Sequence, residues 1–234
     1  MIVAGHQPQY LPFAGFFNKA ILADKFVFVD HVQFEKKGWQ NRNRIKSQMG
    51  WQWLTVPVLT AGRFDQPISE VEIDNTKDWA KTHWRTLTTQ YGKSPHFKEH
   101  ASFFEETYLY PWKRLVDLNI SIISYLMGEF KIQRPLYFSS AFGLTGKKTD
   151  LLTDICEALH CDTYLSGSGP GAKQYVETDK FKAKHLSHVF QKFTPPDYGQ
   201  NKCSVANLSV IDMLFNVGSE KSRKLLDGAG KICQ

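Results

Sequence analysis

The chain has 234 residues, of which 42% are hydrophobic, and it carries a formal net charge of +6. This apolar content is sufficient for a packed core, so a disordered chain is excluded, and the length suits one large domain better than a small disulfide-stapled one. The four cysteines have no zinc-binding spacing. The modest positive charge allows a small anionic ligand, although a solvated basic surface explains it as well, and without a dense basic stripe it does not indicate nucleic acid.

The apolar segments alternate between strand and helix patterns along the chain. A short run at 2–4, a helical pattern at 13–23 and a second run at 26–29 have the size of a βαβ unit. The later segments continue this alternation. Strands are predicted at 53–59, 136–142, 163–166 and 188–193, and helices at 76–91, 100–130 with a break at Pro111, 147–160 and 207–217 with a stop at Gly218.

This alternation predicts an α/β fold, with a mostly parallel sheet and flanking helices. We expect a single domain over residues 1–234, with a helical insert at about 76–130. The N-terminal ten residues lack the pattern of a signal peptide, and the longest uncharged apolar stretch, 118–128, is too short to span a bilayer. We therefore expect a cytoplasmic protein without a membrane span.

Two polar segments follow the first two predicted strands, where parallel sheets bind their ligands. The first, GHQPQYLPFAGFFNK, contains His6, Gln7, Tyr10 and Lys19 and leads into a helix N-terminus that attracts anions. A packed loop in which His6 bonds a backbone carbonyl is the structural alternative. The analogy with a nucleotidyltransferase loop is weak, because a second histidine opening the helix is absent.

The second segment, VDHVQFEKKGWQNRNRIKS, begins with Asp30 at the strand end. Asp30 is a candidate base, and the arginines and amides that follow offer forked donors for phosphate or carboxylate. A structural salt bridge from one arginine is the competing interpretation. The candidate ligand-binding residues here are Gln33, Trp39, Asn41, Arg42 and Lys46.

A third candidate segment, YLSGSGPGAKQY, places a glycine-rich turn after a predicted strand. Its backbone N–H groups are suited to an anion, but neither a Walker loop nor a GxGxxG motif is present. A plain turn is an equal alternative. The histidine pairs His96–His100 and His185–His188 lack a recognised metal motif, so we expect no metal site.

Four motifs together resemble one known family. The run HQPQYLPFAGFFNKAILADKFVFVD, the stretch GWQNRNRIK with GWQWLTVPV, the TYLSGSGPGAKQYV loop and the closing LSVIDMLFNVG look like the WbqC-like protein family. The likeness extends from His6 to Gly218, and Phe13 stands where a tryptophan is common. Several of the family's recurrent positions coincide with candidate site residues of this chain. They are His6, Gln7, Tyr10, Lys19, Asp30, Gln33, Asn41, Arg42, Lys46, Gly167 and Tyr175.

The resemblance implies a transferase of bacterial surface polysaccharide (O-antigen) biosynthesis that moves an acyl or aminoacyl group, such as glycyl, to an amino sugar. We expect His6 or Asp30 to act as the base. The substrate, a nucleotide-sugar or sugar phosphate, is expected to contact Gln7, Tyr10, Lys19, Gln33, Trp39, Asn41, Arg42, Lys46, Ser166, Gly167 and Tyr175.

Two other functions stay open at this point. One is a ligase or nucleotidyltransferase-like enzyme that uses ATP, and the other is a non-catalytic protein that binds a nucleotide-sugar. No coenzyme A or carrier-protein motif identifies the acyl donor. The sequence therefore leaves open whether the reaction uses ATP or another acyl-donor cofactor.

Overall fold

The structure is a computed structural model that describes residues 1–167, 169, 176–199, 205 and 207–233. Its six-stranded sheet has the order β5-β2-β1-β6-β7-β8. Neighbouring strands are parallel, except that β8 runs antiparallel to β7. The strands are β1 (Ile2–His6), β2 (Lys25–Phe28), β5 (Leu136–Phe138), β6 (Thr163–Gly167), β7 (Ser187–Phe193) and β8 (Gly230–Cys233). The predicted α/β fold with a mostly parallel sheet is therefore confirmed.

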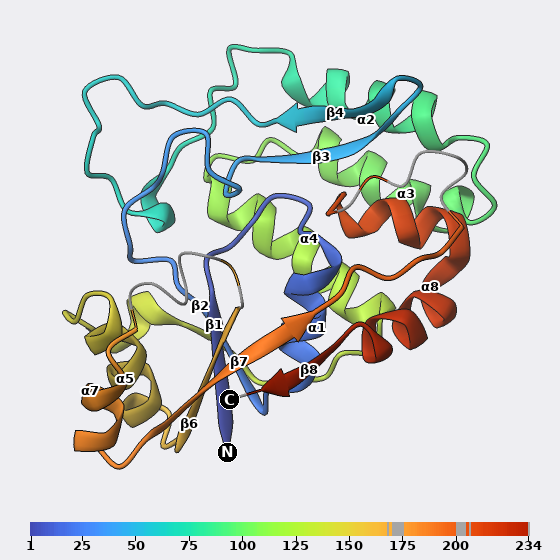
Figure 1. Ribbon diagram of the computed structural model, residues 1–234. Coiled ribbons are helices and arrows are strands. Elements are labelled where there is room, and N and C mark those ends of the chain that lie inside the picture. Colours follow the sequence, from blue (N-terminus) through green and yellow to red (C-terminus); the bar gives the residue numbers. More distant parts are fainter. Residues whose placement is uncertain (168, 170–175, 200–204, 206, 234) are drawn as a thin grey trace.

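Helices cover both faces of this sheet (Figure 1). Val3 and Ala4 of β1 point to opposite faces because side chains alternate along a strand. Val3 packs with α5 (Thr149–Ala158) and with Phe181 of α7 (Thr178–Ala183). Ala4 belongs to the larger apolar cluster on the other face, which includes residues of α1 (Ala14–Leu22) and α8 (Val210–Gly228).

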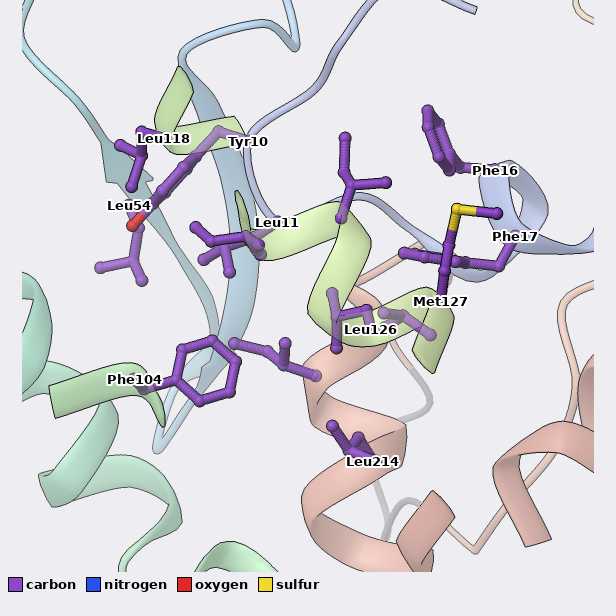
Figure 2. Packing of buried hydrophobic residues seen from close by; sticks show 14 of the residues in the cluster. Tyr10, Leu11, Phe16, Phe17, Leu54, Phe104, Leu118, Leu126, Met127 and Leu214 are labelled. Atoms are coloured by element: carbon purple, nitrogen blue, oxygen red, sulfur yellow. The ribbon is translucent and has the colours of Figure 1, made fainter. Parts of the chain in front are cut away.

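The predicted helical segment contains three helices, α2 (Trp79–Tyr91), α3 (Phe97–Leu109) and α4 (Leu115–Glu129). The chain breaks between α3 and α4 at Pro111, as expected for a residue that cannot donate a backbone hydrogen bond. Buried residues of all three helices join the larger cluster. Figure 2 shows this packing: Leu126 and Met127 of α4 lie close to Phe17 of α1.

A two-stranded antiparallel ribbon lies outside the main sheet, at the top of the view in Figure 1. It consists of β3 (Arg42–Ser47) and β4 (Gly50–Thr55). We did not predict β3, because its alternating arginines hide the strand pattern. The strand predicted at 53–59 instead ends at Thr55, two residues before Pro57, which lacks an N–H for a ladder.

The C-terminal helix extends beyond its predicted end. Gly218 has φ +75°, which favours glycine, and it kinks α8 instead of terminating it. A Cβ atom at this position would lie 2.8 Å from the His96 ring. Further elements are α7, β8 and two short 3-10 turns, Ile68–Glu70 and Ser139–Phe142; the second replaces the end of the strand predicted at 136–142.

Candidate functional site

The central strand β1 ends where the chain connections reverse direction across the sheet. After β1 the chain forms β2 on one side, and β6 later pairs with the other side of β1. Ligands of open parallel sheets bind outside the carboxyl ends of the strands at such a switch point. His6 closes β1 at this position, and Ser166 lies near the end of β6.

His6 is held as a neutral base. Its Nδ1 lies 3.0 Å from the carbonyl oxygen of Gln7. A carbonyl only accepts hydrogen bonds, so Nδ1 carries the hydrogen and Nε2 keeps its lone pair. Burial, and then the charge of Lys19, lower the pKa of His6 well below its ordinary value. The ring packs against Phe16 with the centroids 4.7 Å apart.

Lys19 is a buried amine without an acidic partner. Its side chain is 6% exposed, and Nζ donates a hydrogen bond of 2.9 Å to the carbonyl oxygen of Gly5. No carboxylate among the described residues forms an ion pair with it. Burial lowers the pKa of Lys19 to about 7. We expected this amine to hold a phosphate or carboxylate, but it is bound to the strand beneath the site.

Asp30 joins the ends of two strands. Its buried carboxylate accepts hydrogen bonds from the Ser139 hydroxyl at 3.0 Å, and from the backbone N–H and hydroxyl of Ser140 at 2.9 and 2.7 Å. Its own N–H donates to Ser139 Oγ. These bonds connect the end of β2 to the segment after β5. Three donors therefore occupy the group that we predicted as an alternative base, and this geometry favours an anchoring role.

A small cleft lies beside the β1–α1 loop. It has a volume of about 170 Å³ and is lined by Gln9, Phe13, Trp39, Arg44 and Asn207. Gln9 is 8% exposed, and its Oε1 has no hydrogen-bond partner within the described ranges. A buried acceptor without a donor costs about 1–3 kcal/mol. A ligand that donates an O–H or N–H to Gln9 would recover this cost.

The cleft walls suit a small anionic ligand. Cavities for drug-sized ligands are typically about 300–1,000 Å³, so this one suits a smaller group, such as one sugar ring. Arg44 provides the positive charge, and its guanidinium carbon lies 5.6 Å from the centroid of the Trp39 ring. Trp39 was predicted as a contact, and the structure places it in the cleft wall.

The other predicted residues of the basic segment point elsewhere. Asn41 is buried and donates to the carbonyl of Val56. Arg42 donates to the Lys37 carbonyl and lies over the Trp53 ring, 4.2 Å from its centroid. Lys46 is half-buried on the ribbon. None of these three side chains is among the described lining of the cleft, and their substrate contacts stay predictions.

Tyr10 corrects one expectation. We expected its ring to stack on a ligand, but it is fully buried, beside Leu54 and Leu118 in Figure 2. Its hydroxyl hydrogen-bonds His83 Nδ1 at 2.8 Å and the Tyr108 hydroxyl at 2.5 Å. The aromatic ring of Tyr10 thus belongs to the core, because this side chain turns inward from the loop.

Two predicted glutamines hold loops together. Gln7 accepts a hydrogen bond of 2.7 Å from Gln40, which fixes the β1–α1 loop to the segment before β3. Gln33 donates to the carbonyl of Phe64 and to the Asp65 carboxylate, at an exposed position. These contacts give both residues a structural task, and their predicted ligand contacts stay predictions.

The third predicted segment is described in part. Ser166 is 7% exposed, and its hydroxyl lies 2.8 Å from Nε2 of His188. Gly167 ends β6. Tyr175 lies outside the described residues, as does most of the glycine-rich turn. The ligand roles of all three stay predictions.

Four lining residues were absent from our predicted set. Gln9 and Phe13 belong to the first polar segment that we singled out, and Arg44 is one of the arginines of the second. Asn207 comes from the start of the last predicted helix and reaches the cleft through tertiary packing. Nothing in its local sequence distinguishes it from a helix-capping residue.

In the part of the chain that the structure describes, no three or more His, Cys, Asp and Glu side chains gather as metal ligands do. None of the described helices is both long enough and apolar enough to cross a membrane.

Comparison with known proteins places this architecture in a family. The family model of the WbqC-like protein family matches residues 7–224. The uncharacterized protein Rv1507c of Mycobacterium tuberculosis (strain ATCC 25618 / H37Rv) is 37% identical over 223 residues, which cover 93% of this chain and 94% of the relative. No solved structure matches the chain. The chain therefore belongs to the WbqC-like protein family.

Proposed function

We propose that this protein is a transferase that moves an acyl or aminoacyl group, with glycyl as the first candidate, onto the amine of an amino sugar in bacterial surface polysaccharide biosynthesis. The acceptor sugar binds in the cleft beside the β1–α1 loop. The observation that carries this proposal is Gln9, which lines the cleft and whose buried Oε1 has no hydrogen-bond partner among the described residues, so that a donor from the ligand would satisfy it.

An amino sugar supplies what this cleft lacks. Its hydroxyl and amine groups donate hydrogen bonds to Gln9, and its flat apolar face packs against Trp39. A phosphate attached to the sugar is attracted by Arg44, which offers forked donors. The described lining contains no Asp or Glu that would repel such an anion.

The chemistry requires a neutral base. The amine attacks the acyl carbonyl, a carbon–nitrogen bond forms, and the bond to the leaving group breaks. The attacking nitrogen must lose a proton as it becomes an amide. His6 lies at the start of the same loop, three residues before Gln9. Its Nε2 is the proton acceptor in this proposal. Lys19, buried beneath, opposes protonation of His6.

The test is a product assay with the purified protein. It is mixed with candidate nucleotide-linked amino sugars, glycine and ATP, and the sugar mass and pyrophosphate are followed. A sugar heavier by the acyl group supports the proposal. Pyrophosphate release together with the heavier sugar identifies ATP as the activator of the acyl group.

Other results decide against the transferase. Nucleotide turnover without acylated sugar favours a ligase or nucleotidyltransferase-like enzyme. Binding of the nucleotide-sugar without product, under every donor tried, favours a non-catalytic binding protein. A Gln9→Leu variant tests the cleft itself, because it removes the Oε1 acceptor while keeping a similar volume in the wall.

A further inference from the structure

The outer face of the β3–β4 ribbon combines exposed indoles with basic side chains. In the antiparallel register, Arg42 opposes Thr55, Arg44 opposes Trp53, and Lys46 opposes Trp51. Directly opposed residues share one face of a ribbon. The alternate residues Asn43, Ile45 and Leu54 are buried beneath it.

This face is apolar and exposed at the same time. The side chains of Trp51 and Trp53 are 43% and 38% exposed, and Trp39 beside them is 41% exposed. Met49, in the turn between the two strands, is 99% exposed. Exposed apolar side chains that cluster in this way mark interaction surfaces.

The charge of the surrounding segment has one sign. Between Glu35 and Asp65 the sequence contains six basic and no acidic residues. Arg42, Arg44 and Lys46 project from the same face as the two ribbon tryptophans. This charge favours an anionic partner for the face.

The ring geometry discriminates between anionic partners. Nucleobases stack on open indole faces. Here the Arg42 guanidinium lies 4.2 Å from the Trp53 centroid, and that of Arg44 lies 5.2 Å from the Trp51 centroid. Trp51 and Trp53 are also inclined at 85° to one another, so they do not form a parallel stack.

A lipid headgroup layer suits the same arrangement. Indoles partition to membrane interfaces with their edges among the headgroups, and arginine and lysine bind anionic lipid phosphates. An exposed methionine at the turn supplies the apolar group that enters the acyl boundary. We propose that the β3–β4 ribbon, with Met49 leading, docks this protein peripherally on an anionic membrane surface.

The experiment is vesicle cosedimentation of the full chain. Vesicles of phosphatidylcholine alone are compared with vesicles that also contain phosphatidylglycerol. The wild type is expected to bind the anionic vesicles at low salt and to be released by high salt. Brominated lipid is expected to quench part of the tryptophan fluorescence on binding, because the exposed indoles enter the interface.

Two variants test the surface, and two matched variants control for charge changes elsewhere. Met49→Glu is expected to weaken binding about tenfold, since it places a charge in the acyl boundary, and Lys46→Gln about fivefold. Ile232→Glu and Lys231→Gln change exposed residues of β8, far from the ribbon in Figure 1, and are expected to bind like the wild type.

Several results would overturn the proposal. One is the absence of binding to anionic vesicles at low salt. Another is binding that Met49→Glu leaves intact, since this residue is 99% exposed and its substitution is expected to leave the fold unchanged. Binding of a single-stranded oligonucleotide without vesicle binding would reassign the surface to nucleic acid. The acylation assay uses no vesicles, so its outcome does not decide this proposal.

Discussion

Replacing Lys19 with methionine is expected to stabilise the protein and to flatten the dependence of its stability on pH. The pKa of this amine falls from 10.5 in the unfolded chain to about 7 in the fold. The unfolded chain therefore binds more protons than the folded one between these values, and stability rises with pH across this range. Between pH 7 and pH 9 the wild type gains about 2 kcal/mol from this residue.

Methionine keeps the apolar stem and removes the amine. The variant loses the hydrogen bond to the Gly5 carbonyl, which is worth about 1 kcal/mol. At pH 7 the variant avoids a larger cost of about 4 kcal/mol. This is the free energy of removing the proton from an amine that is charged in the unfolded chain. The net change at pH 7 is therefore a gain in the free energy of unfolding.

Urea denaturation at several pH values from 7 to 9 measures both effects. The difference between wild type and variant isolates Lys19, because the other titrating groups are common to both proteins. The variant is expected to be more stable at pH 7, with the advantage shrinking as pH rises. Parallel stability profiles for the two proteins would refute the account of a buried, depressed lysine.

Three further substitutions separate the site from the core. His6→Ala should abolish acyl transfer while changing the thermal midpoint little, and a large loss of stability would show instead that His6 is structural. Gln9→Leu should raise the KM for the amino sugar about tenfold, at similar or higher stability, because it removes an unpaired buried acceptor; an unchanged KM would exclude Gln9 from the site. Tyr10→Phe should leave KM unchanged but lower the free energy of unfolding by about 1–3 kcal/mol, since His83 and Tyr108 lose their partner; weaker sugar binding with intact stability would contradict its core position.

The main sheet was predictable because its central strands are nearly continuous apolar runs. Residues 2–4 and 26–29 are such runs, and buried parallel strands have this pattern. The ribbon strand Arg42–Ser47 was missed for the opposite reason. Its residues alternate between charged groups and two inward side chains, Asn43 and Ile45, and only Ile45 is apolar, so the strand has almost no hydrophobic signal.

The candidate cleft lies beside a segment that the sequence singled out, but most of its lining residues were not predicted. Strand ends indicated His6 and Asp30, because ligands of parallel sheets gather there. Whether an aromatic side chain faces a ligand or the core depends on a loop's path, which the sequence does not specify. Tyr10 therefore entered the core, whereas Trp39 lines the cleft. Asn207 reaches the same cleft from a distant segment, and no local sequence pattern predicts that contact.

The most direct test of the central claim is the acylation of an amino sugar by this protein and by its His6→Ala variant. The account predicts a sugar heavier by one acyl group with the wild type and none with the variant, although both bind the acceptor with similar affinity. Product formation at equal rates by both proteins would contradict the account, because it would place the proton acceptor away from the end of β1.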